Sequence, residues 1–237
     1  RFFSATDAGG NSESGTWGVE DEKLFDLVVS KTDTTKYSLN IILTSSYHAP
    51  YTVDVYKKGF PYRSEKDFPE AMKPYFDGGM TMEEMGHLWY GDYAIGKFME
   101  KSTKKYPTAI YTFTGDHFGR RFINSKPNLY ERSSVGFIMY GKNIPKATHQ
   151  TAGSHIDIMP TLIEMIAPKG FEYYSFGTSM YAPQKTMSIA FNKIITNSDL
   201  YYLPKEAQVE KIHLDNVKES QIEATPLLTD YNKQMGL

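Results

Sequence analysis

Two polar clusters in the sequence carry side chains that could bind a metal ion or an anionic substrate. Asp116 and His117 follow the apolar run 108–114, and Ser45–His48 follows the apolar run 37–44. Carboxylate and imidazole groups are ligands for Zn²⁺, Mn²⁺ and Mg²⁺-like ions. Gly115 gives the backbone the freedom to turn both side chains toward one ion. The dipeptide by itself is explained more simply as a capping aspartate beside a solvated histidine, so the metal assignment depends on the surrounding sequence.

Two further histidines are explained by local structure. Glu83 lies one helical turn before His87, which predicts an ion pair on the helix surface. Asp157 follows His155 at the start of a predicted helix, where a carboxylate is favoured as a capping residue. Neither pair needs a ligand to account for it.

The two clusters need a scaffold that brings strand ends together. Apolar runs predict strands at residues 37–43, 108–114 and 134–140, and apolar residues at helical spacing predict helices at 21–30, 81–105 and 155–167. Strands that alternate with helices predict an α/β fold, a three-layer α/β/α sandwich around a mostly parallel sheet. In such sheets ligands bind at the carboxyl ends of the strands, so His48 and the Asp116-His117 pair are predicted to face one cleft.

The last third of the chain differs from this pattern. Residues 187–195 and 200–203 predict a hairpin across the polar residues 196–199. Residues 204–237 are polar and are predicted to form a tail that is helical near 205–217.

Composition excludes several classes of function. The 237 residues carry 26 basic and 28 acidic side chains, and no basic stripe is present that could neutralise nucleic-acid phosphates. The chain has no cysteine, which excludes disulfides, thiolate metal sites and a cysteine nucleophile within it. No run of roughly eighteen apolar residues predicts a membrane span. Because the first residue is Arg1, we expect a fragment of a longer chain.

Five short segments form a series along the chain. They are residues 17–25 (Trp-Gly-Val-Glu-Asp-Glu-Lys-Leu-Phe), 46–51 (Ser-Tyr-His-Ala-Pro-Tyr), 90–98 (Tyr-Gly-Asp-Tyr-Ala-Ile-Gly-Lys-Phe), 111–117 (Tyr-Thr-Phe-Thr-Gly-Asp-His) and 155–162 (His-Ile-Asp-Ile-Met-Pro-Thr-Leu). In this order they resemble blocks of the alkaline phosphatase/sulfatase superfamily, and the first two resemble its lipoteichoic acid synthase (phosphoglycerol transferase) branch. Single short motifs are weak evidence, whereas five in the family's order are not expected by chance.

The resemblance implies roles for particular residues. Asp116 and His117 match the family's metal-binding pair, and His48 matches the histidine that contacts the substrate phosphate. Trp17, with Asp21, matches a block near the substrate groove, although a groove-wall aromatic explains Trp17 equally well. Arg120, or its neighbour in sequence, could touch an anionic headgroup, which we infer from charge and proximity alone; a solvated surface arginine is the simpler explanation.

The resemblance also implies what lies outside the chain. Residues 1–237 would be the C-terminal part of a single sulfatase-like domain whose N-terminal part is missing, with family blocks over about 17–203. The family's nucleophile, a Thr (Ser or Cys in relatives), and an acidic metal ligand belong upstream. We therefore assign no catalytic nucleophile to this chain and expect the fragment itself to be inactive.

The implied function is metal-dependent transfer of phosphoglycerol, or a related phospho-headgroup, through a phospho-Thr-type intermediate. The substrates would be a phospholipid headgroup and a glycerophosphate- or glycan-bearing acceptor, and the intact protein would be anchored by upstream membrane helices on the outer face or in the periplasm. Two alternatives stay open, a sulfatase that hydrolyses sulfate esters and a non-catalytic binding subdomain.

The histidines also bear on the number of metal ions. Two-zinc members of the superfamily add an Asp four residues before a His, and no histidine of this chain is preceded in that way. We therefore expect one divalent ion in the intact enzyme, with Mn²⁺ or Mg²⁺ favoured over Zn²⁺, and Ca²⁺ for a sulfatase.

Overall fold

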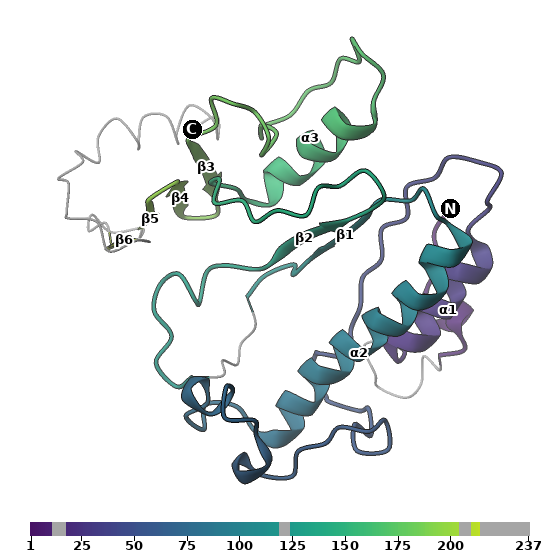
Figure 1. The fold of residues 1–237 in the computed structure, drawn as a ribbon, viewed down its shortest axis with the longest axis vertical. Helices are drawn as coiled ribbons and strands as arrows, with labels where there is room; N and C mark the ends of the chain where they lie inside the picture. The colour runs from purple at the N-terminus through teal and green to yellow at the C-terminus, as the bar shows by residue number, and fades with distance from the viewer. Residues whose placement is uncertain (11–17, 119–123, 204–209, 214–237) are drawn as a thin grey trace. The chain divides into compact units, whose positions relative to one another are not determined.

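The chain folds into two compact units (Figure 1). A computed structural model describes residues 1–10, 18–118, 124–203 and 210–213. Unit 1 comprises Arg1–Pro127 and Ser134–Ile144, and unit 2 comprises Asn128–Ser133 and Pro145–Leu237. Unit 1 contains Asp21, His48, Asp116 and His117.

Two helices form the framework of unit 1. Helix α1 spans Asp21–Lys31 and packs beside α2, which spans Met82–Lys105 (Figure 1). Both predicted helices are confirmed. Helix α2 begins at a capping box, in which the Thr81 side chain accepts from the Glu84 N–H and the Glu84 carboxylate accepts from the Thr81 N–H. Short 3₁₀ helices lie at Ala5–Ala8 (η1), Glu65–Asp67 (η3) and Lys73–Tyr75 (η4).

The core of unit 1 lies between these helices and the chain that connects them. Phe25 of α1 and Phe98 of α2 stack with ring centroids 4.7 Å apart. Tyr90 and Ala94 of α2 are almost fully buried beside them. The connecting segment between the helices adds buried apolar side chains to the same cluster, namely Val53, Val55, Phe60, Phe68 and Met80. Burial of this apolar stripe, more than helix propensity, stabilises α2.

The sheet of unit 1 is smaller than predicted and antiparallel. Strand β1 (Tyr111–Thr114) pairs with β2 (Phe137–Tyr140), with Tyr111 opposite Tyr140. The predictions at 108–114 and 134–140 are therefore confirmed as strands of one sheet, shortened at their starts. All strand pairs in the described ranges are antiparallel. The α/β class holds, but a mostly parallel sheet is not what the described strands form.

The strand predicted at residues 37–43 is wrong. The segment forms no ladder with the other described residues, and four of its apolar side chains are exposed: Tyr37, Leu39, Ile41 and Leu43. Ile42, in the same segment, is partly buried and packs against the core of unit 1. An apolar run reports that a segment suits a strand, but a strand also needs a partner whose N–H and C=O groups face it.

Unit 2 combines one helix with a four-stranded sheet. Helix α3 spans His155–Ile166, as predicted, and contains Pro160. The strands β3 (Met187–Ala190), β4 (Lys193–Thr196), β5 (Asp199–Tyr202) and β6 (Glu210–His213) pair in that order as an antiparallel meander. The predicted hairpin is present between β4 and β5.

Two predictions in unit 2 need correction. The run 187–195 is itself divided by a turn at Asn192, whose φ of 55° is left-handed, so it forms two strands instead of one. The helix predicted near 205–217 is wrong at Glu210–His213, which form β6. The rest of that prediction lies outside the described residues.

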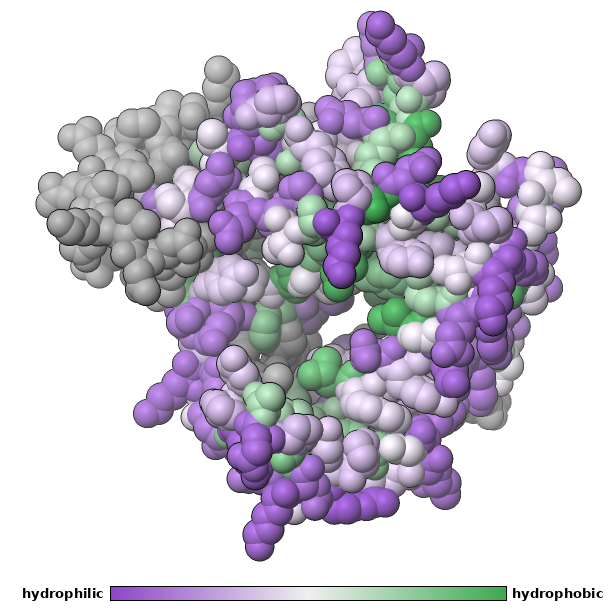
Figure 2. All heavy atoms as spheres, in the orientation of Figure 1, coloured by the Kyte–Doolittle hydropathy of each residue, from purple (hydrophilic) through white to green (hydrophobic). Residues whose placement is uncertain are grey.

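The described residues on one face of the chain are mainly hydrophilic. Figure 2 shows one face on which purple, hydrophilic residues predominate and hydrophobic residues appear between them. Within the parts of the chain that the structure covers, no helix is both long and apolar enough to cross a bilayer.

Candidate metal and phosphate site

Asp116 and His117 lie directly after β1, at an exposed turn. Their side chains are 68% and 63% exposed, respectively. Gly115 precedes them where space is restricted, because a Cβ there would come within 3.0 Å of Val135 Cγ1. The His117 N–H donates to Asp116 Oδ1 at 2.9 Å, which ties the carboxylate to the backbone of its neighbour. The turn thus directs both side chains toward solvent, where an ion could reach them.

The geometry of this pair suits a shared cation. His117 Nδ1 lies 2.6 Å from the Phe118 carbonyl oxygen, so Nδ1 carries the proton and Nε2 carries the lone pair of the neutral ring. Nε2 lies 3.6 Å from Asp116 Oδ2. Two ligands that each bind one ion at about 2.1 Å are roughly 3–3.5 Å apart. The observed separation is thus close to the one that two ligands of a single ion require.

The pair is short of a complete ligand set. No group of three or more His, Asp or Glu side chains that could hold a metal ion occurs among the residues that the structure describes. His48 therefore does not join Asp116 and His117 in such a group. The argument that parallel strand ends would bring them to one sheet edge does not apply either. Among the described residues, the segment before His48 pairs with no strand, and β1 pairs antiparallel.

His48 lies in a turn that begins at Ser45. The His48 N–H donates to the Ser45 carbonyl at 3.1 Å. Its Nδ1 lies 2.5 Å from the Ala49 carbonyl oxygen, so this nitrogen carries the proton. His48 and His117 thus share one tautomer, in which Nδ1–H is bonded to the next residue's carbonyl and Nε2 is the acceptor.

The turn before His48 is attached to the start of α1. Asp21 Oδ1 accepts hydrogen bonds from the Ser46 hydroxyl at 2.8 Å, the Ser46 N–H at 3.1 Å and the Ser45 N–H at 3.3 Å. In return, Ser46 Oγ accepts from the Asp21 N–H at 3.0 Å, which satisfies a donor that the helix leaves open. Two of the family-like segments, 17–25 and 46–51, are therefore bonded to each other.

Aromatic rings surround the same turn. Tyr47 packs against the core of unit 1, and its ring lies 6.2 Å from that of Tyr51. Burial raises the pKa of the Tyr47 phenol to about 12, with smaller contributions from Tyr51 and Glu84. The Tyr47 phenol therefore keeps its proton to a higher pH than an exposed tyrosine does.

His87 is not the surface residue that its spacing from Glu83 predicted. It is fully buried. Its Nδ1–H donates to the main-chain carbonyl of Glu83 at 2.8 Å, and its Nε2 accepts from the Val53 N–H at 3.2 Å. Both ring nitrogens are thus used to join α2 to the connecting segment, and the predicted ion pair with the Glu83 carboxylate is wrong.

Two predicted substrate-binding residues, Trp17 and Arg120, lie outside the described residues. Sequence reasoning missed Ser46 as the partner of Asp21. The hydroxyls of residues 45–46 were visible as part of a polar cluster, but a contact across 25 positions leaves no periodic signal.

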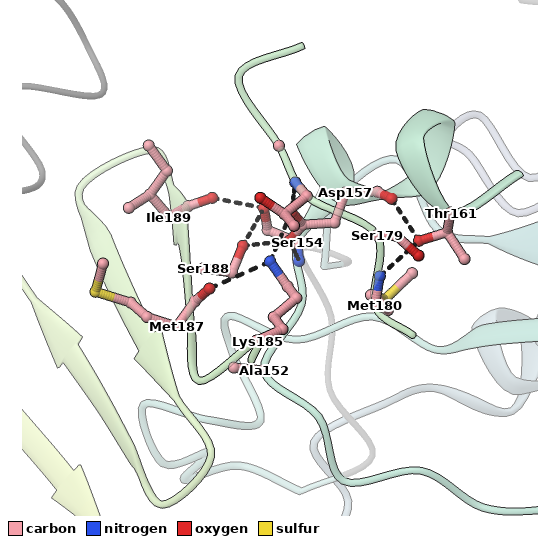
Figure 3. Close-up of polar contacts among 12 residues, drawn as sticks. Ala152, Ser154, Asp157, Thr161, Ser179, Met180, Lys185, Met187, Ser188 and Ile189 are labelled. Atoms are coloured by element: carbon pink, nitrogen blue, oxygen red, sulfur yellow. Dashed lines mark hydrogen bonds and ion pairs between the residues drawn. The ribbon is translucent and has the colours of Figure 1, made fainter. Parts of the chain in front are cut away.

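Asp157 of unit 2 caps α3, as predicted, and does more (Figure 3). Its Oδ2 accepts from the Ser154 N–H at 2.9 Å. Its Oδ1 accepts from the Thr178 N–H at 2.9 Å and forms a salt bridge of 2.8 Å with Lys185. The side chains of Asp157 and Lys185 are only 1% and 4% exposed, and Ser188 donates to the same carboxylate. With its partners inside the unit and little solvent access, this network is structural.

Comparisons with known proteins agree with the resemblance of this chain to the sulfatase superfamily. A family model described as Sulfatase matches residues 2–166, which include Asp21, His48, Asp116 and His117. The chain is also similar to lipoteichoic acid synthase 1 of Bacillus subtilis (strain 168), with 22% identity over 258 aligned positions. That alignment covers 100% of this chain and 38% of the relative, so the chain spans less than two fifths of the relative's length. No solved structure matches the chain.

Proposed function

The chain belongs to the sulfatase family, within the alkaline phosphatase/sulfatase superfamily, and from that premise we propose that its protein is a metal-dependent phosphoglycerol transferase of the cell envelope. The observation that carries the proposal is the Asp116-His117 pair, whose Oδ2 and Nε2 lie 3.6 Å apart inside the segment that the family model matches. The similarity to a lipoteichoic acid synthase supports a phospho-headgroup as the transferred group.

We propose one divalent ion at Asp116 and His117. One carboxylate and one imidazole, in a chain without cysteine, suit Mn²⁺ or Mg²⁺, and Ca²⁺ would take the place of these ions in a sulfatase. When bound, the ion would lower the pKa of an attacking hydroxyl and stabilise charge on the transferred phosphate. The nucleophile, a threonine in this proposal, and the remaining ligands are supplied from outside the chain.

His48 is proposed to bind a non-bridging phosphate oxygen of the substrate. Its Nδ1–H is bonded to Ala49, so Nε2 is the nitrogen that would face the phosphate, donating once the ring is protonated. Trp17 and Arg120 are kept as proposed contacts to the headgroup. The substrates would be a phospholipid headgroup and a glycerophosphate- or glycan-bearing acceptor. We place the enzyme at the outer face of a membrane or in the periplasm, anchored by membrane helices elsewhere in the protein.

An assay of the protein in its native length tests this function. We expect it to release diacylglycerol from phosphatidylglycerol vesicles in the presence of Mn²⁺, and Asp116→Asn to reduce the rate by at least about 100-fold, since metal ligation is lost. Asp26→Asn, on the exposed face of α1, is the matched control and should leave the rate unchanged. Hydrolysis of an aryl sulfate without headgroup transfer would favour the sulfatase alternative, and neither reaction would contradict both enzyme proposals.

Metal binding by the chain alone tests the site separately. Two protein ligands rarely hold an ion against water, so we expect at most one Mn²⁺ per chain, bound weakly. Calorimetric titration should show this binding abolished by Asp116→Asn and retained in Asp26→Asn. Tight binding of more than one ion, or binding that survives Asp116→Asn, would show that the metal site is elsewhere.

A further inference from the structure

The carboxylate of Asp21 is directed at a single turn. Within the described ranges, the hydrogen bonds to its side chain come from Ser45 and Ser46. The residue is 3% exposed, which leaves almost no surface for a substrate to touch. Any contribution of Asp21 to the proposed phosphate site is therefore made through the turn that it binds.

Because Asp21 is buried and acidic, its carboxylate needs the hydrogen bonds from this turn. No salt bridge to this carboxylate occurs among the described residues, in contrast to Asp157 with its lysine. Its charge is stabilised by N–H and O–H donors and by the N-terminal end of α1. These donors act over hydrogen-bond distances, so a displaced turn would leave a buried charge without partners, which is costly. The turn is held in place for that reason.

The turn is also packed closely from the segment before α1. A Cβ on Gly18 would lie 2.2 Å from Ser45 Oγ and 3.3 Å from Ser45 Cβ, so glycine lets the two segments approach this far without a shift of the Ser45 side chain. Gly18 thus packs closely against Ser45, one of the two serines whose N–H groups donate to Asp21.

The held turn continues directly into His48. The Ser45 carbonyl accepts the His48 N–H at 3.1 Å, and the ring is then fixed by its own bond to Ala49. Resting on the proposed role of His48 in binding phosphate, we infer that Asp21 is the positioning residue for His48. It sets where Nε2 lies and does not touch the substrate itself.

The ring tautomer of His48 in the isolated chain tests the positioning. Two-bond ¹H–¹⁵N spectra distinguish the ring nitrogens of each histidine. We expect His48 to be in its Nδ1–H form, Asp21→Ala to convert it to a mixture of tautomers, and Asp21→Asn to do so less, because its amide oxygen still accepts. His87 should keep its form in every variant, and Asp26→Ala on the same helix should change nothing. If Asp21→Ala does not fold, Ser46→Ala gives the same test. An unchanged His48 spectrum would overturn the inference.

A double-variant cycle separates positioning from stability. In the headgroup-transfer assay of the native-length protein, Asp21→Ala should lower kcat/KM by about 10- to 100-fold, the cost of a displacement of roughly 1 Å. Because Asp21 acts through His48, the double variant should lose no more than His48→Gln alone. Additive losses would contradict the inference. If the wild-type protein transfers nothing, the proposed function fails, and the histidine spectra still decide the positioning.

Discussion

Asp21 and Asp157 are two solutions to the same physical problem. Each is an acidic residue in the first turn of a helix, each is at most 3% exposed, and each accepts hydrogen bonds from backbone N–H groups. Asp157 is neutralised by Lys185, and its partners belong to a network internal to unit 2 (Figure 3). Asp21 has no such cation among the described residues, and its partners are two consecutive residues that lead to His48.

The difference shows that a buried carboxylate does not by itself mark a functional site. What distinguishes the two is where their partners lead. A carboxylate paired with a buried lysine stabilises the interior of its own unit, away from solvent and from any substrate. A carboxylate whose described hydrogen bonds all come from one turn constrains the position of the residues in that turn, here the partly exposed His48.

The largest effect should come from breaking the ion pair in unit 2. Asp157→Ala would leave the Lys185 ammonium buried without its partner, so we expect a loss of about 3–5 kcal/mol in the free energy of unfolding. Urea denaturation at neutral pH measures it. Asp26→Ala, which removes an exposed partner of Lys101, is the control and should have little effect. Equal losses in the two variants would mean that the Asp157–Lys185 pair is not buried from solvent as described.

A smaller effect is expected from the turn in unit 1. Ser46→Ala removes the hydroxyl that both caps α1 and donates to Asp21, while the two backbone N–H donors remain, so we expect a loss of about 1–2 kcal/mol. Ser45→Ala is a matched control, since Asp21 is bonded to the backbone of Ser45. Amide exchange of Asp21 should accelerate in Ser46→Ala alone. Equal losses of stability and equal amide exchange in Ser46→Ala and Ser45→Ala would show that the Ser46 hydroxyl does not hold the turn to α1.

The smallest effect concerns alkaline pH. Because burial raises the pKa of Tyr47 to about 12, the folded chain keeps this proton while the unfolded chain loses it near pH 10. Stability from Tyr47 is therefore complete below about pH 10 and is lost as the pH rises through about 12. Tyrosinate absorbance, with Tyr47→Phe subtracted, measures the pKa. In Ser46→Ala the pKa of Tyr47 should fall toward 10. An unchanged pKa would show that Tyr47 stays buried without the hydrogen bond between the Ser46 hydroxyl and Asp21.

Helices were predictable because their signals are local. The apolar stripe of α2 and the Thr81–Glu84 capping pair lie within one element, and the structure begins and ends α2 within a residue of the prediction. The strands β1 and β2 were also found from their local apolar runs, whereas β6 was predicted as helix. The segment 37–44 has an equally apolar run, but strand formation depends on a partner elsewhere in the chain, which one run cannot report.

For the site residues too, local contacts were predictable and contacts with distant residues were not. Spacing identified Glu83 as the neighbour of His87 but not which oxygen would bind, since the choice of the main-chain carbonyl follows from burial of the ring. Asp157 was recognised as a cap from its position, whereas Lys185, 28 residues later, has no local pattern that pairs it with Asp157. The metal assignment of Asp116 and His117 stays a prediction until ion binding is measured.

The bond between Ser46 and the first turn of α1 also affects the order of folding. Glu20, at the N-cap, provides no side-chain cap. The Asp21 N–H at the start of α1 is bonded instead by Ser46, which lies 25 positions after Asp21 in the sequence. Closing a loop of that length costs chain entropy before the bond returns any stability. The helix and the histidine turn should therefore form, and open, as one cooperative unit. Local unfolding that frays the start of α1 would release His48 in the same event.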